Sequence, residues 1–189
     1  MFNDFDAILK NLIVSGLSNG LNEKNILFVT PDVGFKPELP AINCFLYDIR
    51  ENSELRSNEW FVDKNADGTV SKKRAPLWLD CSYIITTWAT TIESEHRLLG
   101  EVFATLLSYE VKAGDSSNHS VNNRSGKTFL KFNKNMENNI YDMWNSLGIK
   151  PRSMLSYTLT ASIEKQAPEN IMLVKEKVIN MNVIKEMAL

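Results

Sequence analysis

The segment DKNADGTVSKKR, residues 63–74, places oxygen-bearing side chains at alternating positions, which is the spacing of a calcium-binding loop. Asp63, Asn65 and Asp67 stand where such a loop has its first ligands, and Gly68 supplies the sharp turn. Carboxylate and amide oxygens of this kind coordinate Ca²⁺. The loop also requires a glutamate at its last position, where both carboxylate oxygens hold the ion.

The last position of this segment is Arg74, whose charge repels a cation, and the flanking sequence does not favour the two helices of an EF-hand. Strand-forming residues 57–62 precede the segment, and Pro76 disfavours a helix directly after it. Asp67-Gly68 is typical of tight hairpin turns because both residues tolerate positive φ. The segment is therefore predicted to be a polar hairpin loop between two strands.

Two histidines and two cysteines are the remaining candidates for catalysis or zinc binding. His96 lies early in a strong helical pattern, and a general base there would need a nucleophile beside it, for which no local motif is found. Cys44 and Cys81 lie in apolar strand-like runs and His119 in a polar segment, without the short spacings of zinc ligands. The sequence therefore predicts no catalytic residue, no metal and no cofactor, and buried free thiols rather than a disulfide.

The composition is that of an ordinary globular protein. The chain has 189 residues, of which 43% are apolar, and a formal net charge of -2, so no global positive field draws it to nucleic acid or to anionic lipid. The strand that contains Trp78 and Trp88 has no interleaved arginine or lysine, and we expect the four tryptophans in the core or at a protein interface. The N-terminus carries acidic residues before its apolar stretch and does not read as a signal peptide. We expect synthesis in the cytoplasm, with neither nucleic acid nor membrane as a partner.

Hydrophobic periodicity predicts the secondary structure. Helices are expected at residues 3–18, 92–109 and 134–147, and strands at 26–30, 41–49, 77–88, 128–132, 154–163 and 171–184. The strand at 77–88 has one solidly apolar face, which should meet the core, and one mixed face, which should be partly wet or meet a partner. The predicted fold class is α+β, with a mixed, largely antiparallel sheet and helices packed mainly on one side.

Four segments, in this order and spacing, carry a resemblance to a known family. They are CFLYDIRENSELRSN (44–58), APLWLDCSYIITTW (75–88), EHRLLGEVFATLL (95–107) and MWNSLGIKPRSMLSYTLTASIE (143–164). The succession FLY-x-x-x-x-N-x-x-x-R, P-L-x-L-x-x-Y and EH-x-x-LG resembles the N-terminal domain of the cap proteins of contractile injection systems, the phage-tail-like particles that bacteria build. The resemblance covers about residues 4–164.

The resemblance implies a structural role as a tail terminator with a sandwich fold. Such a protein is expected to form a ring that ends the inner tube and contacts the last sheath layer. The expected ring is a hexamer. The implied partners are other copies of the chain, the tube protein and the sheath protein. Residues 1–165 would form the cap domain, and residues 166–189 a strand-like extension packed on the same domain or on a neighbouring subunit. Some family members extend further at the C-terminus, where functions such as anchoring would lie.

A ring requires head-to-tail contacts, and we expect them at the polar segments 58–73 and 113–126 and at the strand-like tail 171–184. The residues predicted for the assembly interface are Arg50, Glu51, Asn52, Arg56, Trp60, Lys72, Lys73, Arg74, Asn118, Arg124, Lys175 and Lys177. The first four of these match the family pattern. For them, holding the end of the 41–49 strand is the preferred explanation over contact with a partner, because buried polar groups must be paired.

Two other functions remain open from the sequence. One is a cytoplasmic adaptor that binds a peptide or an oligonucleotide as a monomer without catalysis. The other is an enzyme that uses His96. Under the leading hypothesis the protein is made in the cytoplasm and becomes part of a particle that is either released or retained by the cell.

Overall fold

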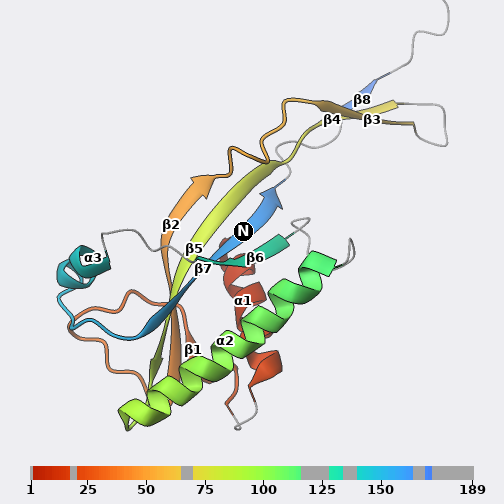
Figure 1. Ribbon diagram of the computed structural model, residues 1–189. Coiled ribbons are helices and arrows are strands. Elements are labelled where there is room, and N and C mark those ends of the chain that lie inside the picture. The colour runs from red at the N-terminus through yellow and green to blue at the C-terminus, as the bar shows by residue number, and fades with distance from the viewer. Residues whose placement is uncertain are drawn as a thin grey trace, which may run out of the picture.

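The computed structural model describes residues 2–17, 21–64, 70–115, 128–133, 140–163 and 169–171, and these residues form two β-sheets and three α-helices. In chain order the elements are α1 (Phe2–Gly16), the 3₁₀ helix η1 (Glu23–Asn25), β1 (Ile26–Leu27), β2 (Ala41–Glu51), β3 (Trp60–Lys64), β4 (Val70–Arg74), β5 (Leu77–Trp88), α2 (Ile92–Asp115), β6 (Thr128–Phe132), α3 (Ile140–Ser146), β7 (Met154–Ile163) and β8 (Glu169–Ile171). The smaller sheet projects from one end of the larger one (Figure 1).

The larger sheet has the strand order β1-β2-β5-β7-β6. β1 runs parallel to β2, and every other neighbouring pair is antiparallel. β5 is paired on both edges, with Ala41 opposite Trp88 on the β2 side and Leu77 opposite Ile163 on the β7 side. The α+β class with a mixed, largely antiparallel sheet is therefore confirmed.

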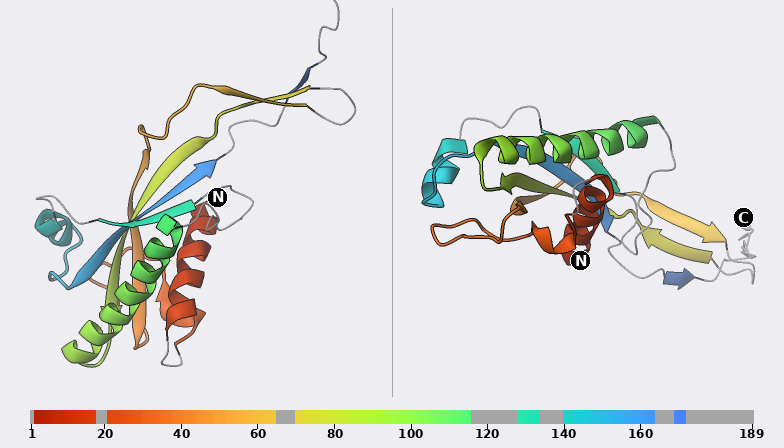
Figure 2. Two further views of the ribbon diagram at one scale, coloured as in Figure 1. Left: turned by 45° about the vertical axis from the view of Figure 1, so that its right-hand side comes forward. Right: turned by 90° about the horizontal axis from the view of Figure 1, so that it is seen from below.

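Helices α1 and α2 lie side by side over one face of this sheet (Figure 2). The odd-numbered residues of β5 point into the space beneath them, and Cys81, Tyr83 and Ile85 are fully buried there. The cluster that fills this space consists of Phe5, Ile8, Leu9, Ile13, Ile26, Ile42, Cys44, Cys81, Tyr83, Ile85, Leu98, Val102, Leu106, Leu130, Tyr157, Leu159 and Ala161. The apolar face predicted for residues 77–88 thus meets the core, because alternation sends every second side chain to the same side.

The smaller sheet, with strand order β3-β4-β8, corrects one expectation from the sequence. Strand-forming residues were expected at 57–62 and a polar hairpin loop at 63–74. The strand is confirmed in part, whereas the loop is shorter than expected, because 60–64 and 70–74 pair as an antiparallel ribbon with Trp60 opposite Arg74. Residues 65–69, which hold the predicted Asp67-Gly68 turn, lie outside the described part of the chain. Pro76 has no backbone N–H and marks the point where the chain passes from the ribbon into β5.

The remaining boundaries differ modestly from the predicted ones. The strands at 128–132 and 154–163 are confirmed, whereas α2 continues six residues beyond the predicted end at 109, to Asp115. Thr91 caps α2, because its Oγ1 accepts a hydrogen bond from the Ser94 amide at 3.2 Å. Of the predicted tail strand, only Ile171 is described, in β8, and there it pairs with β4 of the same chain. No helix within the described ranges is both long and apolar enough to cross a membrane.

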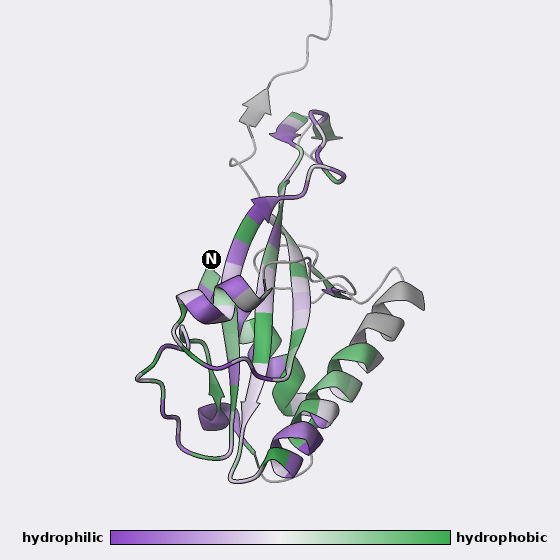
Figure 3. Cartoon of the chain, turned by 60° about the vertical axis from the view of Figure 1, so that its left-hand side comes forward, coloured by the Kyte–Doolittle hydropathy of each residue, from purple (hydrophilic) through white to green (hydrophobic). Residues whose placement is uncertain are grey.

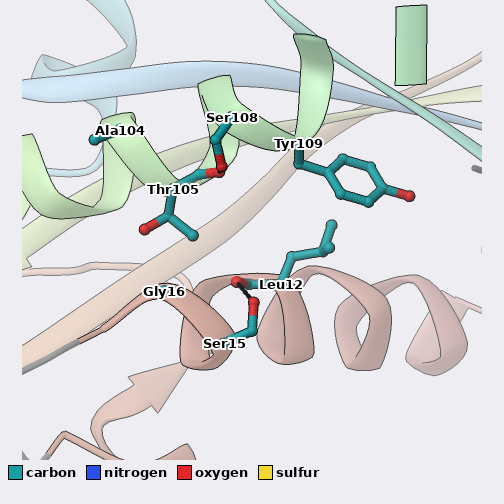
Figure 4. A pocket seen from close by; sticks show the side chains of 7 residues that line it. All are labelled: Leu12, Ser15, Gly16, Ala104, Thr105, Ser108 and Tyr109. Carbon is teal, nitrogen blue, oxygen red and sulfur yellow. Dashed lines mark hydrogen bonds between the residues drawn. The ribbon is translucent and has the colours of Figure 1, made fainter. Parts of the chain in front are cut away.

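The packing of α1 on α2 depends on a residue without a side chain. A Cβ atom placed on Gly16 would lie 2.2 Å from Thr105 Oγ1 and 2.7 Å from its Cβ, which is closer than real contacts allow. Figure 4 shows Gly16 at the end of α1 facing Thr105 across a shallow groove of about 400 Å³. The hydroxyls of Ser15, Thr105 and Ser108 in this groove each donate to a carbonyl of their own helix. The groove is therefore best explained as a close approach of two helices.

We expect Gly16→Ala to lower the free energy of unfolding by about 1–3 kcal/mol, because the added methyl group must push α2 away. Gly100→Ala is the matched control, since nothing lies within 4 Å of the Cβ that it adds in the middle of α2. That control should raise stability by about 0.5–1 kcal/mol, the usual gain when alanine replaces a helical glycine. Denaturant unfolding measures both, and equal stabilisation by the two substitutions would contradict the packing described above.

Candidate assembly surfaces

Asn52, a residue of the first family-like segment, holds the end of β2 in place by hydrogen bonds to other residues of the chain. Its Nδ2 donates to Asp80 Oδ1 and Oδ2 at 3.1 and 3.0 Å, and its Oδ1 accepts from the Leu55 amide at 2.9 Å. Its own amide donates to the Trp78 carbonyl at 2.9 Å. Thr160 Oγ1 adds a third hydrogen bond to Asp80, at 2.6 Å. Asn52 therefore ties β2, β5 and the following turn together, as the fold-stabilising interpretation expected.

The two arginines of the same segment make only surface contacts. Arg50 Nε lies 2.7 Å from Asp48 Oδ2, and Arg56 Nε lies 3.6 Å from Glu51 Oε1. The Arg50 side chain is 78% exposed and that of Arg56 is 58% exposed, so these pairs contribute little to stability. Hydrophilic residues gather at the arrowhead of β2, just before the turn that holds Asn52 and Arg56 (Figure 3). Both guanidinium groups are accessible to a partner.

Other family-like positions also act within the fold. The Tyr83 hydroxyl donates to Asp6 Oδ1 at 2.8 Å and so joins β5 to α1. Burial, together with the hydrogen bond and charge of Asp6, raises the pKa of this phenol. Near the start of α2, Glu95 forms an ion pair with Arg152, and the Arg152 guanidinium stacks 3.8 Å from the centre of the Trp88 ring. These contacts fasten segments that lie far apart in the sequence.

His96 has a hydroxyl neighbour but not the surroundings of a catalytic base. Its Nε2 lies 3.1 Å from Ser153 Oγ, in an exposed position. A nucleophile–base pair has this separation, but a third group must orient the base and a cleft must hold a substrate. The adjacent Glu95 carboxylate is engaged by Arg152 and by the Ala89 amide. The contact between His96 and Ser153 joins residue 153 to α2.

The two thiols lie beneath the helices. Burial and the Asp6 carboxylate raise the pKa of Cys44, and burial and the Asp80 carboxylate raise the pKa of Cys81 to about 12. Both are free, as predicted. Among the residues that the structure describes, no three His, Cys, Asp or Glu side chains are arranged to hold a metal ion. His119 lies outside those residues.

The ribbon brings four of the predicted interface residues together. Trp60 carries the Lys72 ammonium 4.1 Å and the Arg74 guanidinium 4.9 Å from its ring centre. Trp60 is opposite Arg74 in the register, and Lys73 lies between the two cations on the strand, opposite Phe61. The sequence predicted Trp60 and these basic residues for the same interface. It gave no reason to expect that the Trp60 ring contacts Lys72 and Arg74 within one chain.

A second surface lies on the sheet face opposite the helices, which is the mixed face of residues 77–88 that the sequence predicted to be partly wet or to meet a partner. Trp78 of β5 stacks on Phe129 of β6 with ring centres 5.6 Å apart, and Phe129 is 43% exposed. Beside this stack runs a row of hydroxyls, in which Ser82 Oγ lies 3.2 Å from Thr158 Oγ1. The sequences of β5 and β7 each contain alternating polar residues. Which of these residues lie side by side follows only from the register of the two strands.

Four predicted interface residues remain untested by this geometry. Asn118, Arg124, Lys175 and Lys177 lie outside the described part of the chain. The other eight fall at two neighbouring places, the end of β2 with its following turn and the ribbon.

Comparisons with known proteins were made for sequence and for fold. The family described as the Pvc16 N-terminal domain matches residues 4–175. No curated protein sequence matches the chain. The fold is similar to that of the sheath/tube terminator of the extracellular contractile injection system PVC in its extended state, with a TM-score of 0.70, 20% identity, and 100% of this chain and 65% of that one covered. It is also similar to the tube-terminating cap of the anti-feeding prophage, with a TM-score of 0.66, 23% identity, and 95% and 61% covered. The chain therefore spans a little under two thirds of the length of these structures.

We expect Asp80→Asn to lower the free energy of unfolding by about 1–3 kcal/mol, because an amide group would then face the donors of Asn52 and Thr160. Asp48→Asn is the matched control on the neighbouring strand. It loses only the surface pair with Arg50 and should cost about 0–1 kcal/mol. Urea unfolding of both variants tests this, and equal costs would remove Asp80 from its structural role.

The raised thiol pKa values predict a loss of stability in alkali. In the unfolded chain a thiol ionises near pH 8.5, whereas the folded state keeps Cys81 protonated up to about pH 12. The contribution is fully present below pH 8 and should be lost at up to about 1.4 kcal/mol per pH unit for each thiol above pH 9. Denaturant unfolding under reducing conditions between pH 7.5 and 9.5 measures the slope. A Cys44→Ala/Cys81→Ala variant should flatten it, and an unchanged slope would contradict the assignment to the thiols.

Proposed function

The chain belongs to the Pvc16 N-terminal domain family, and from this premise we propose that it is a structural cap that terminates the inner tube of a contractile injection system. The family match covers most of the chain, and this is the observation that supports the proposal best. The two similar structures, both described as terminators or caps, point the same way. In the proposal, residues 1–165 form the cap domain and residues 166–189 an extension of it.

We propose that the protein acts by shape and packing, without catalysis. The family-like polar residues support this, because Asn52, Tyr83 and Glu95 are each engaged in contacts that hold the fold. An active site built from them would have to give up those contacts. No observation on the described residues favours the adaptor that binds a peptide or an oligonucleotide.

In the proposed assembly the protein forms a hexameric ring with head-to-tail contacts, in which one patch of a subunit meets a different patch of the next. Arg50 and Arg56 at the turn after β2 are the proposed contacts between subunits, and the basic and aromatic residues of the ribbon are the proposed contacts with other proteins of the particle. The two arginine side chains are exposed, and their ion pairs contribute little to the stability of the fold. The ring would meet the end of the tube on one side and the last sheath layer at its periphery. The protein would be made in the cytoplasm and become part of the particle.

Mass measurement in solution tests this proposal. We expect the purified chain to assemble into a species of six times its own mass when the tube protein of the same system is added, because the tube end provides the template. Electron microscopy should show tubes that stop growing at capped ends. A chain that stays monomeric and leaves tube length unchanged would contradict the proposal.

The Arg50→Ala/Arg56→Ala variant separates interface from fold in this experiment. Its stability should stay within about 1 kcal/mol of the parent, because both ion pairs are exposed. Ring formation should nevertheless weaken about tenfold or more if these guanidinium groups meet the neighbouring subunit. An unchanged ring would remove the two arginines from the proposed interface.

A further inference from the structure

The ribbon has one protected edge and one open edge. In the three-stranded sheet, β4 lies in the middle and β8 covers its far side, so β3 is an outer strand. No described segment pairs with the outer edge of β3. Trp60, Phe61 and Val62 follow one another on this strand and are 40%, 46% and 56% exposed. Proteins usually protect such an apolar edge, because its unpaired backbone groups attract other strands.

The hydrogen-bond register shows which backbone groups of β3 face outward. The Ala75 amide donates to the Glu59 carbonyl at 3.0 Å, which makes 59 and 75 a hydrogen-bonded pair. In an antiparallel ladder such pairs alternate with non-hydrogen-bonded pairs. Phe61, opposite Lys73, is then bonded to β4, whereas Trp60 and Val62 direct their N–H and C=O groups away from it. The open edge thus offers two residues for pairing.

The charge beside this edge is positive and held in place. The Lys72 ammonium and the Arg74 guanidinium extend from β4 across the Trp60 ring, at 4.1 and 4.9 Å from its centre. Strands in a sheet are about 4.8 Å apart, so a strand added next to β3 would bring its side chains within reach of both cations. A carboxylate opposite Trp60 would meet them directly.

We propose that the open edge of β3 is a strand-addition site for an extended, acidic segment of a partner protein in the particle. Main-chain hydrogen bonds to Trp60 and Val62 provide the pairing, and Lys72 and Arg74 select carboxylates on the added strand. A second copy of the chain fits this edge poorly. Two β3 strands placed side by side would bring the cations of both ribbons together, and like charges in adjacent strands repel. The proposal rests on the proposed function for the identity of the partner proteins that are tested.

The experiment uses the full-length chain with the purified tube protein and the purified sheath protein of the same system, added one at a time. Val62→Pro removes an outward N–H without removing a bond to β4, and Val62→Thr is the matched control that keeps this N–H. Amide hydrogen exchange follows Trp60, Phe61 and Val62, and a binding titration gives the affinity. Circular dichroism verifies that each variant is folded.

We expect one of the two proteins to slow the exchange of the Trp60 and Val62 amides, with the Phe61 amide already protected in the free chain. Val62→Pro should weaken that binding about tenfold or more, and Val62→Thr by no more than about twofold. Lys72→Glu/Arg74→Glu, which leaves the backbone edge intact, should weaken it to a similar extent and reduce its dependence on salt.

Three results would overturn the proposal. Binding that is unaffected by Val62→Pro and by the charge reversal would leave the cap function standing and reject the strand-addition site. Protection of the Trp60 and Val62 amides that appears in the chain alone and grows with its concentration would assign the edge to a second copy. Failure to bind either tube or sheath protein would reject the proposed function, and the strand-addition site with it.

Discussion

The fold depends on β5, the one strand in the described structure that is paired along almost its whole length on both edges. β2 and β7 are in register with it over ten residue pairs each, and all the polar contacts of the second family-like segment start from it. Its odd-numbered side chains build the floor of the core beneath α1 and α2. Of its even-numbered residues, Asp80 and Ser82 belong to the polar row on the opposite face. A shift of register by one residue would exchange these two faces, so the burial of Cys81, Tyr83 and Ile85 fixes the alignment of the whole sheet.

The polar residues that mark the family serve this same architecture. Asn52 reaches Asp80 across 28 positions of sequence, Tyr83 reaches Asp6 across 77, and Arg152 reaches Glu95 across 57. Each contact ties an element to β5 or to the helix layer above it. Residues that are already engaged in this way are poorly placed to form an assembly interface. The surfaces free to act on a partner are therefore those at the edges, where exposed side chains have weak contacts or none that the fold needs.

The ribbon is the clearest of these surfaces, because its physics differs from that of the body. Helices α1 and α2 pack on the larger sheet, and the ribbon extends beyond it (Figure 1). On the face that carries Trp60, two cations cover the aromatic ring, which stays in contact with water while it is partly shielded. Such a structure gains little stability for the monomer. Its open edge, its apolar strand and its fixed positive charge are properties of a surface that is completed by another chain.

The sequence by itself determined the parts that depend on local periodicity. The alternation in residues 77–88, the strands at 128–132 and 154–163 and the burial of the free thiols could all be predicted, because burial imposes a period of two or 3.6 on nearby residues. Only the tertiary structure decided what depends on register and on distant pairing. The polar segment 63–74 is predicted as a hairpin loop, yet its residues 63–64 and 70–74 belong to the strands of the ribbon, because the pairing of β4 with β3 and β8 is not encoded in a local pattern. The partner of Asn52, the stack of Trp78 on Phe129 and the cations over Trp60 were unpredictable for the same reason: each requires two strands in a known alignment, and alignment is set by the whole core.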